Sequence, residues 1–376
     1  MRFIGYGTDT IKEKKDFSLF NVTNLFIFRP AKFNFHVCKN QGELMRIINR
    51  MFLFLFLTTA ASGQSIKIAT YNIYFLDAGI SSERQANLKQ VIAELNADVI
   101  AFQEINNRAA LENILPDSYK IAIIDAKDEV QEVALAVRQP LKIHSSKFIY
   151  ADEKFDNAFP RSRNLLQVEV EWKAARYFFL VCHAKSRRGG RAETDARREE
   201  ASALIVDHIK ANLADKNVIV LGDFNDNPDD RSMNILEYGD ANAPGGIDTK
   251  EDSFLFNTSE DFLNSDFCSF GYNYLFKDTE LDTFELTILG AARENNKWRG
   301  QKNVDYYRDV RVKAILFDQI LVSKNLQNRV GQSGVFNKSV AVRGQSSRIK
   351  FQDGELIYTR RGAFASDHVP VWMVLN

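Results

Sequence analysis

Short apolar runs with the spacing of β-strands alternate with amphipathic stretches along residues 65–375, and this alternation limits the possible folds more than any other feature. Two amphipathic stretches, 84–95 and 194–213, place apolar residues at helical spacing. The residues predicted to form the buried stripes of these helices are Leu88, Val91, Ile92 and Leu95, and then Ala201, Leu204, Ile205 and Ile209. The pattern predicts a layered protein of the α/β (α+β) class.

The apolar runs also indicate how the strands pair. The predicted strands are 65–73, 97–105, 133–138, 165–172, 176–184, 217–226, 314–323 and 369–375. Several follow one another with no helix between them, which favours antiparallel pairing and therefore mixed sheets. Residues 227–313, rich in Asn, Asp and Gly, form either long loops or an insertion. The absence of an internal repeat or a clear linker predicts a single domain.

The composition is that of an ordinary globular protein. The chain has 376 residues, of which 45% are hydrophobic and 12% aromatic, enough to bury one large core or two modest ones. Its 49 basic and 49 acidic residues balance, so total charge by itself indicates neither a polyanionic partner nor a membrane.

Residues 45–64, MRIINRMFLFLFLTTAASGQ, have the three parts of a secretory signal. Arg46 and Arg50 form a basic start, an apolar run follows, and Ala61-Ser62-Gly63 is a small-residue cleavage site. The apolar run is too short to span a bilayer, and a buried core helix is the alternative. We therefore predict a mistaken N-terminal extension over 1–44, a signal peptide over 45–63, a mature domain over 64–376, and a secreted or periplasmic protein.

The cysteines fit export without requiring it. Cys38 lies in the predicted extension, which leaves Cys182 and Cys268 for the mature chain. These two allow one disulfide, but Cys182 lies inside the apolar run YFFLVCH, where a buried free thiol is the commoner state. Their spacing does not indicate a zinc site.

Polar side chains recur at or near the ends of the predicted strands. They are Asn72, Glu104, His183, Asp223, Asn225, Asp318, Asp367 and His368. Each alone has an ordinary interpretation as a turn residue, a solvated charge or a self-capped loop. Burying such groups without partners is unfavourable, so together they are predicted to converge on one another, on a metal or on water at one sheet edge.

The ordered motifs YN (71–72), FQE (102–104), GDFND (222–226), FDQILVS (317–323) and SDH (366–368) resemble those of the endonuclease/exonuclease/phosphatase superfamily. HAKS (183–186) and KWRGQ (297–301) look most like its bacterial extracellular nuclease branch. The resemblance implies a four-layered α/β sandwich, in which two mixed sheets pack face to face with helices outside and share the site at one edge. It also implies a single catalytic domain over the mature chain.

Phosphodiester hydrolysis needs an activated water, neutralised phosphate oxygens and a stabilised leaving group. Glu104 is an oxygen ligand suited to a hard cation, which favours Mg²⁺ or Mn²⁺ over zinc. By resemblance Glu104 is the main metal ligand, with Asn72 beside it and Asp367 on the other side.

The resemblance also assigns the proton-handling residues. His368 meets the water or the phosphate, and Asp318 fixes its tautomer. Asp223 orients or deprotonates the attacking water, so the general base is either His368 or Asp223. Asn225 would donate to a phosphate oxygen, and His183 would assist the leaving group.

Basic residues near these motifs are candidates for substrate binding. Lys185 begins the loop KSRRGGR, which contains Arg187, Arg188 and Arg191 and is either a solvated loop or a clamp on substrate phosphates. Arg163, or Arg161 beside it, resembles an arginine that the family places near substrate. Trp298 and Arg299 could contact a base, although a buried tryptophan is the alternative.

Three functions follow from these residues. The leading one is a secreted, monomeric, metal-dependent endonuclease that cleaves DNA with little sequence specificity, with RNA as a further candidate substrate. The alternative is a phosphoesterase acting on a small or lipid phosphate such as an inositol phosphate or sphingomyelin. Because no exposed aromatic hairpin is obvious in the sequence, we expect no stable membrane association. A binding module without catalysis is the third, and the full set of polar residues argues against it.

Overall fold

The computed structural model describes residues 65–125, 131–160, 163–188, 191–245, 252–264, 267–270, 316–353 and 355–376. The chain divides between Ser62 and Gly63, and the account below concerns the second unit. The predicted extension 1–44, the predicted signal peptide 45–63, Arg161 and the motif at 297–301 lie outside the described residues.

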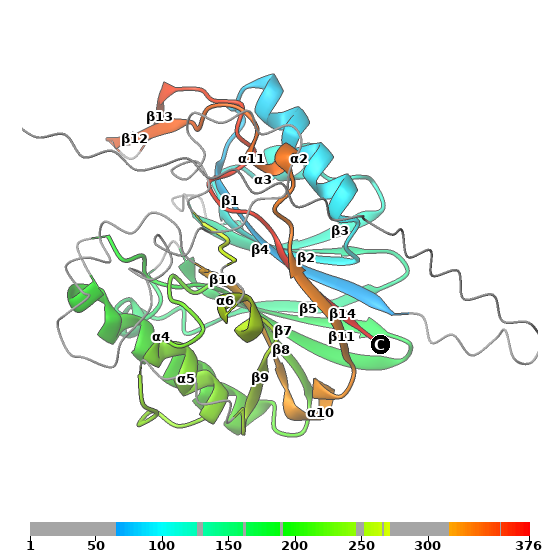
Figure 1. Cartoon of the computed structure of the whole chain (residues 1–376), viewed down its shortest axis with the longest axis vertical. Coiled ribbons are helices and arrows are strands. Elements are labelled where there is room, and N and C mark those ends of the chain that lie inside the picture. Colours follow the sequence, from blue (N-terminus) through cyan, green and yellow to red (C-terminus); the bar gives the residue numbers. More distant parts are fainter. Residues whose placement is uncertain are drawn as a thin grey trace, which may run out of the picture. The chain divides into compact units, whose positions relative to one another are not determined.

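Two six-stranded mixed sheets form the body of this unit (Figure 1). The first has the order β11-β14-β1-β2-β4-β3, and the second has the order β5-β6-β7-β8-β10-β9. Strands of the first sheet are β1 (Ile66–Leu76), β2 (Val99–Ile105), β3 (Tyr119–Ile123), β4 (Glu132–Arg138), β11 (Val330–Val335) and β14 (Val371–Leu375). Strands of the second are β5 (Lys142–Ile149), β6 (Leu165–Trp172), β7 (Ala175–His183), β8 (Asn217–Asp223), β9 (Leu255–Asn257) and β10 (Asp318–Ser323).

Each sheet contains one parallel pair among its antiparallel neighbours. β1 runs parallel to β2, and β7 runs parallel to β8. Each of these pairs is connected through a helix, α2 (Ser82–Leu95) in the first sheet and α4 (Arg191–Asn212) in the second. The carboxyl ends of parallel strands meet at the same edge of a sheet, so each pair brings two strand ends together there.

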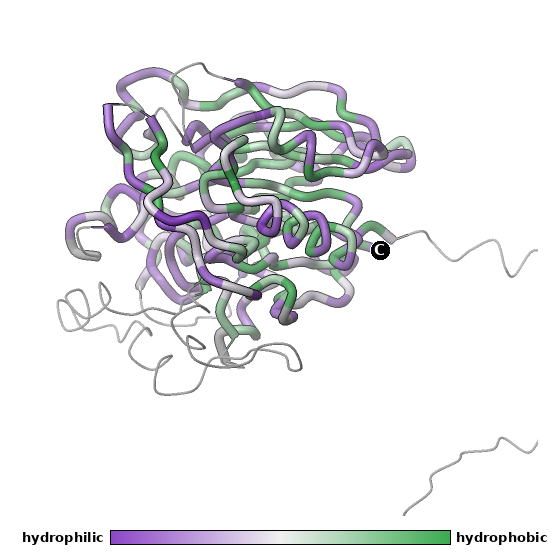
Figure 2. Tube along the Cα trace, turned by 90° about the horizontal axis from the view of Figure 1, so that it is seen from above, coloured by the Kyte–Doolittle hydropathy of each residue, from purple (hydrophilic) through white to green (hydrophobic). Residues whose placement is uncertain are grey.

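Helices cover the outer faces of the two sheets (Figure 1). α2 and α3 (Arg108–Ile114) share a core with the first sheet, and α4 and α5 (Arg231–Tyr238) share one with the second. A third apolar cluster contains residues of both sheets and fills the space between them. The predicted four-layered sandwich is therefore confirmed. In Figure 2 hydrophobic stretches recur along the strands, while hydrophilic stretches mark many of the connecting loops.

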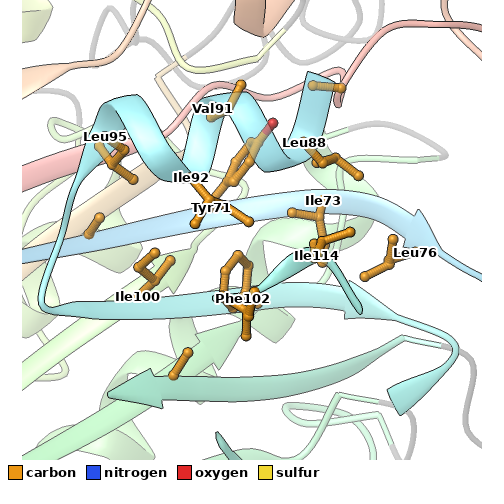
Figure 3. Packing of buried hydrophobic residues seen from close by; sticks show 14 of the residues in the cluster. Tyr71, Ile73, Leu76, Leu88, Val91, Ile92, Leu95, Ile100, Phe102 and Ile114 are labelled. Carbon is orange, nitrogen blue, oxygen red and sulfur yellow. The ribbon is translucent and has the colours of Figure 1, made fainter. Parts of the chain in front are cut away.

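The predicted stripe of α2 forms its buried side. Leu88, Val91, Ile92 and Leu95 are buried, and Figure 3 shows Ile92 between the helix and the strands that carry Tyr71 and Phe102. The helix begins after Ser81, whose Oγ accepts a hydrogen bond from Arg84 N at 3.1 Å, and ends at Asn96 in a left-handed conformation. The stripe of α4 is buried in the same way at Ala201, Ile205 and Ile209, with Leu204 partly buried.

The remaining elements are short. They are the 3₁₀ turn Glu153–Phe155, α6 (Glu260–Asn264), α10 (Lys324–Gln327), α11 (Ser339–Val342), and a separate hairpin of β12 (Arg348–Gln352) and β13 (Glu355–Arg360). Cys182 is a buried free thiol, which confirms the interpretation of this residue, and Cys268 is buried as well. Within the described ranges, none of the helices has the length and apolar character needed to cross a membrane.

Candidate active site

The strand register brings three predicted site residues side by side in the second sheet. Asp223 ends β8, and its Cα partners on the two neighbouring strands are His183 in β7 and Asp318 in β10. Gly222 makes this close approach possible, because a Cβ there would lie 1.9 Å from the carbonyl oxygen of Cys182 and its φ is +149°. Any larger residue would separate β7 from β8, and with them His183 from Asp223.

Side chains from the first sheet complete the cluster. Asn72 of β1 donates from Nδ2 to Asp223 Oδ2 at 2.9 Å. His183 Nε2 lies 3.6 Å from Asp223 Oδ2 and 3.7 Å from Glu104 Oε1, and Glu104 comes from β2. His368 Nε2 lies 3.9 Å from Asp223 Oδ2. Asp223 is thus the centre of a polar site at the shared edge of the two sheets.

His368 is held from several directions. Its Nδ1 lies 2.6 Å from Asp318 Oδ2, so the carboxylate fixes the orientation of the ring and leaves Nε2 facing Asp223. Phe270 and Phe317 pack beside the imidazole, with ring centroids 4.9 and 6.5 Å away. Ser269 accepts hydrogen bonds at Oγ from the backbone N–H groups of Phe317 and Asp318.

Helix α2 fixes the segment that carries Asp367 and His368. Arg84 is fully buried, and its guanidinium donates to the carbonyl oxygens of Ala365 at 3.1 Å and of Ile73 at 2.7 Å. Ser366 Oγ donates to the carbonyl oxygen of Asn72 at 2.7 Å. Two segments far apart in the sequence are therefore joined next to the site.

The environment of the site shifts the pKa values of its ionisable side chains in different directions. Burial and the charge of Asp367 raise the pKa of Glu104 to about 7, and burial raises the pKa of Asp223 to about 6. Burial opposes a charge on His368, but the carboxylates of Asp318 and Asp223 outweigh it and raise its pKa to about 10. Burial lowers the pKa of His183 well below its usual range. The site therefore pairs a cationic imidazole with a neutral one.

Two site residues have strained backbones. Glu104 has a φ of +63° and Asn225 a φ of +55°, values in the left-handed region that non-glycine residues rarely adopt. Such outliers cluster at functional sites. Asn225 also uses its backbone N–H to donate to Asp223 Oδ1 at 2.9 Å, and its Nδ2 donates to the carbonyl oxygen of Ala184 at 3.2 Å. That second bond uses one of the two hydrogens of the Asn225 side-chain amide, which leaves one for the predicted hydrogen bond to a phosphate oxygen.

The residues present fit a hard divalent cation. Glu104 Oε2 is buried, and no described residue supplies it with a hydrogen bond. Within the part of the chain that the structure describes, His, Cys, Asp and Glu form no metal-holding group of three or more. Mg²⁺ does not need one, because it is usually bound by one or two protein carboxylates and several waters. The elevated pKa values of Glu104 and Asp367, which burial causes first, are those of a site that would gain from a bound cation.

The predicted substrate-binding residues Arg163, Lys185 and Arg188 differ in how deeply they are buried. Arg163 lies beside the site: burial lowers its pKa, the charges of Glu104 and Asp223 oppose that effect, and its Nη1 donates to Ala184 O at 3.1 Å. Lys185 is half-buried with Nζ 3.3 Å from Ser186 O, and Arg188 is exposed.

Arg187 does not belong to a flexible clamp, and the interpretation of it as a solvated or phosphate-binding residue is wrong. It is buried, pairs with Asp226 at 2.9 Å and with Asp230, and donates from Nε to Asn225 O at 2.8 Å. Its charge is used within the protein, where it supports the turn that carries Asn225. The side chain of Arg191 lies outside the described residues.

Sequence reasoning missed the residues that support the site, above all Arg84, Ser269, Phe270 and Ser366. A signal for Arg84 was present, because it precedes Leu88 by four positions and therefore lies on the apolar stripe of α2. Burying a charged side chain is unfavourable unless it is hydrogen-bonded, so an arginine on a buried stripe indicates that hydrogen-bond acceptors lie near its guanidinium.

The four layers and the carboxylate–imidazole cluster at the sheet edge define a hydrolase of phosphate esters. A model of the Endonuclease/Exonuclease/phosphatase family matches residues 81–277. The chain belongs to this family, whose enzymes typically use a divalent metal such as Mg²⁺. Asp318, Asp367 and His368 lie beyond the matched residues, so their place in the site rests on the geometry above.

Several solved structures are similar to this chain at low sequence identity. Zebrafish (D. rerio) TDP2, crystallised with a single-strand DNA product, has a TM-score of 0.50 and 17% identity, over 83% of this chain and 99% of that one. A mannosyl-6-phosphatase of Bacteroides thetaiotaomicron has a TM-score of 0.48 and 16% sequence identity, and the match covers 83% of this chain and 100% of that one. An endonuclease/exonuclease/phosphatase family protein from the same bacterium has a TM-score of 0.48 and 16% identity, and the match covers 83% of this chain and 97% of that one. Curated protein sequences gave no match.

Proposed function

We propose that the protein is an exported, divalent-metal-dependent endonuclease that hydrolyses DNA, and RNA as a second substrate, with little sequence preference. The observation that carries the proposal is the arrangement of His183 and His368 around Asp223, at 3.6 and 3.9 Å from the same oxygen. Two imidazoles that face one carboxylate offer a phosphodiester separate contacts on its attacked and leaving sides. The HAKS motif at 183–186 supports the bacterial extracellular nuclease branch.

Asp223 is the better candidate for the general base. With a pKa raised to about 6 it is mostly ionised at neutral pH and still basic enough to accept a proton. Asn72 and the backbone of Asn225 hold its two oxygens in place. With its pKa raised to about 10, His368 is cationic at that pH and cannot accept a proton, which supports Asp223 as the base of the two candidates.

His368 then serves the phosphate. Oriented by Asp318, its Nε2–H donates to a phosphate oxygen and offsets the charge that develops in the transition state. His183 is neutral, and its Nε2 lies between Glu104 and Asp223, where it donates a hydrogen bond to the leaving oxygen. Arg163 and Lys185 add positive charge on the substrate side, and Arg188 meets more distant phosphates.

Glu104 would hold the metal ion, together with Asp367 and the side-chain oxygen of Asn72. A bound Mg²⁺ or Mn²⁺ supplies Lewis-acid charge at the phosphate. The buried Glu104 Oε2 supports this assignment. The protein would act as a monomer, with nucleic acid as its partner and no stable membrane association.

A phosphoesterase acting on a small or lipid phosphate is the second candidate. The sequence argument against a lipid substrate was that no exposed aromatic hairpin is obvious, and the structure contains one: β12–β13 exposes Phe351 and Ile357. The absence of such a hairpin therefore no longer argues against a lipid substrate, and the suitability of β12–β13 for a membrane is examined below.

Supercoiled plasmid incubated with the mature protein and Mg²⁺ tests the proposal. We expect nicked and then linear DNA, no cleavage with a chelator, and recovery when Mg²⁺ or Mn²⁺ is restored. A parallel panel holds single-stranded RNA, an inositol phosphate and sphingomyelin vesicles. Intact plasmid beside rapid turnover of a small or lipid phosphate would overturn the nuclease assignment. N-terminal sequencing of the exported protein tests cleavage after Gly63.

A further inference from the structure

The β12–β13 hairpin carries both of the large hydrophobic side chains that are exposed within the described part of the chain, Phe351 at 47% and Ile357 at 39%. The hairpin belongs to neither six-stranded sheet and lies near α2 in Figure 1. Exposed apolar side chains that gather on one element indicate a contact surface rather than chance exposure.

A row of aromatic rings connects this hairpin to the candidate active site. Tyr74 N donates to Asn72 Oδ1 at 3.0 Å, which places the first ring two residues from the site. The ring of Tyr74 is 5.7 Å from that of Phe75, and the ring of Phe75 is 5.1 Å from that of Phe351. Tyr74 and Phe75 are half-buried and sit in a bulge of β1 with φ values of +47° and +46°. The row ends at its most exposed member.

The two exposed side chains of the hairpin lie on opposite faces. Phe351 pairs with Leu356, whereas Ile357 pairs with Lys350, so alternation puts Phe351 on the Phe75 side and Ile357 on the other. The tip carries exposed Asp353 and Glu355. A hairpin that inserts into lipid needs an apolar tip, and acidic residues there are repelled by anionic headgroups. This hairpin is therefore poorly suited to a membrane.

Positive charge gathers at the base of the hairpin instead. Arg361 is exposed and lies over the ring of Tyr358 at 5.7 Å. Tyr358 pairs with Ile349 and therefore shares the face of Phe351. Arg348 and Lys350 are also exposed, but they lie on the face of Ile357. The base continues directly into the segment that leads to Asp367. The charge of Arg361 would attract the backbone of a polyanion that lies along the row towards the base of the hairpin.

We propose that Tyr74, Phe75 and Phe351 form a stacking row for the bases of a single-stranded nucleic-acid segment whose phosphate occupies the active site. The inference rests on the proposed nuclease function and names the form of substrate that it prefers. Bases of a single strand present free π-faces to aromatic side chains, while the cations contact the backbone. Bases within a duplex are already stacked on each other, so the row favours single strands or unwound ends.

Binding of a short fluorescent oligothymidine, followed by anisotropy in chelator so that cleavage does not occur, tests the row. We expect Phe351→Ala to weaken binding by roughly 5- to 150-fold, the range that loss of one stacked base gives. Phe351→Trp should keep the affinity. Ile357→Ala is the matched control, because it removes exposed apolar area from the opposite face, and it should leave binding unchanged. Binding of duplex DNA should be equal in wild type and Phe351→Ala.

Several outcomes would overturn the proposal. They are equal affinity of wild type and Phe351→Ala for the oligonucleotide, equal weakening by Phe351→Ala and Ile357→Ala, and binding to phosphatidylserine vesicles that is lost in Phe351→Ala, which would identify a lipid surface.

Activity separates this proposal from the proposed function. Hydrolysis of bis(p-nitrophenyl) phosphate with Mg²⁺ should be the same in wild type and Ile357→Ala, and an equal Tm of wild type and Phe351→Ala would show that the Phe351 variant folds. If the protein cleaves DNA but its oligonucleotide binding ignores Phe351, the stacking row fails and the nuclease stands. If binding depends on Phe351 but no nucleic acid is cleaved, the nuclease assignment fails instead.

Discussion

Arg84 Nε donates to the carbonyl oxygen of Ala365 at 3.1 Å, and this bond joins helix α2 to the segment that carries Asp367 and His368. Ser81 and Asn87 of the same helix region donate to the carbonyl oxygens of Gly362 and Ala363 at 2.8 and 2.7 Å. The first two turns of α2 thus hold three carbonyl groups of one segment. The position of the C-terminal site residues depends on a helix almost 300 residues earlier in the chain.

Arg84→Met should therefore affect both stability and activity. Each hydrogen bond from a charged donor contributes about 1.5–3 kcal/mol, so we expect the free energy of unfolding to fall by at least this amount. Turnover should fall as well, because Asp367 and His368 lose their anchor. Arg108→Met is the control, since Arg108 is 45% exposed and pairs with Glu112 within α3. Urea unfolding and plasmid nicking measure the two effects; unchanged turnover in a folded Arg84→Met would remove the anchoring role.

Glu104→Gln should abolish activity and stabilise the metal-free protein. Because folding raises the pKa of Glu104 from 4.5 to about 7, this group favours the folded state at low pH, and its contribution is lost as pH rises from 4.5 through 7. At pH above 7 the loss is about 3 kcal/mol, at 1.36 kcal/mol per pKa unit. Gln removes the buried charge, so its Tm in chelator should exceed that of wild type at pH 8 and approach it near pH 4.

Magnesium provides the control for that variant. Wild type should gain Tm as Mg²⁺ is added, because an ion that binds only the folded state stabilises it. The Tm of Glu104→Gln should rise much less when Mg²⁺ is added. A variant with the same Mg²⁺ response as wild type, or with a lower Tm than wild type in chelator at pH 8, would contradict the assignment of Glu104 as the main ligand.

Periodicity in the sequence was sufficient to predict a layered α/β protein with mixed sheets, whereas the four-layered arrangement was predicted only from the family resemblance. Every run predicted to be a strand overlaps an observed strand, because central strands are buried on both faces and read as continuous apolar segments. Edge strands were missed for the opposite reason. β5 alternates exposed residues such as Lys142 and Lys147 with few apolar ones, and β11 is polar along most of its length. The β12–β13 hairpin had a usable signal in Asp353-Gly354, a dipeptide typical of two-residue turns.

The site was predictable where a residue is polar within an apolar run, as at Asp318 and His183. Its supports were not, because Ser366 and Ser269 act through single hydroxyl groups on loops whose partners lie far away in the sequence. Arg187 shows the opposite error. Its neighbours Arg188 and Arg191 suggested one basic surface, but adjacent residues on a loop point in different directions, and only the structure distinguishes the buried arginine from the exposed one.

Asp318→Asn should change the ionisation of His368. In wild type the carboxylates of Asp318 and Asp223 overcome the effect of burial and raise the pKa of His368 to about 10. Without the Asp318 charge, burial opposes protonation more strongly, and we expect the pKa to fall towards its ordinary value of about 6.5. NMR titration of the imidazole measures this directly, and the chain has five histidines to resolve.

The same variant should lose roughly 10²- to 10⁴-fold in turnover at neutral pH, the amount that a positioned acid–base group supplies. His368→Ala should lose a similar amount, and the double variant little more, because the two residues act as one unit. A large further loss in the double variant would show that Asp318 has a separate role. Near-normal turnover of His368→Ala would remove His368 from catalysis.

Arg187 and Arg188 are adjacent in the sequence and provide a matched pair with opposite expectations. Arg187 is buried between Asp226 and Asp230, so Arg187→Met leaves two buried carboxylates without this partner and should cost about 3–5 kcal/mol of unfolding free energy. Arg188 is exposed, so Arg188→Ala should leave stability unchanged. Arg188→Ala should instead weaken DNA binding uniformly across sequences and reduce the slope of log affinity against log salt concentration by about 0.9 for duplex DNA.

Thermal unfolding measures the stability of the two variants, and anisotropy at several salt concentrations in chelator measures their DNA binding. Stability loss in both variants, or a salt slope that changes only with Arg187, would show that the two side chains had been assigned the wrong way round.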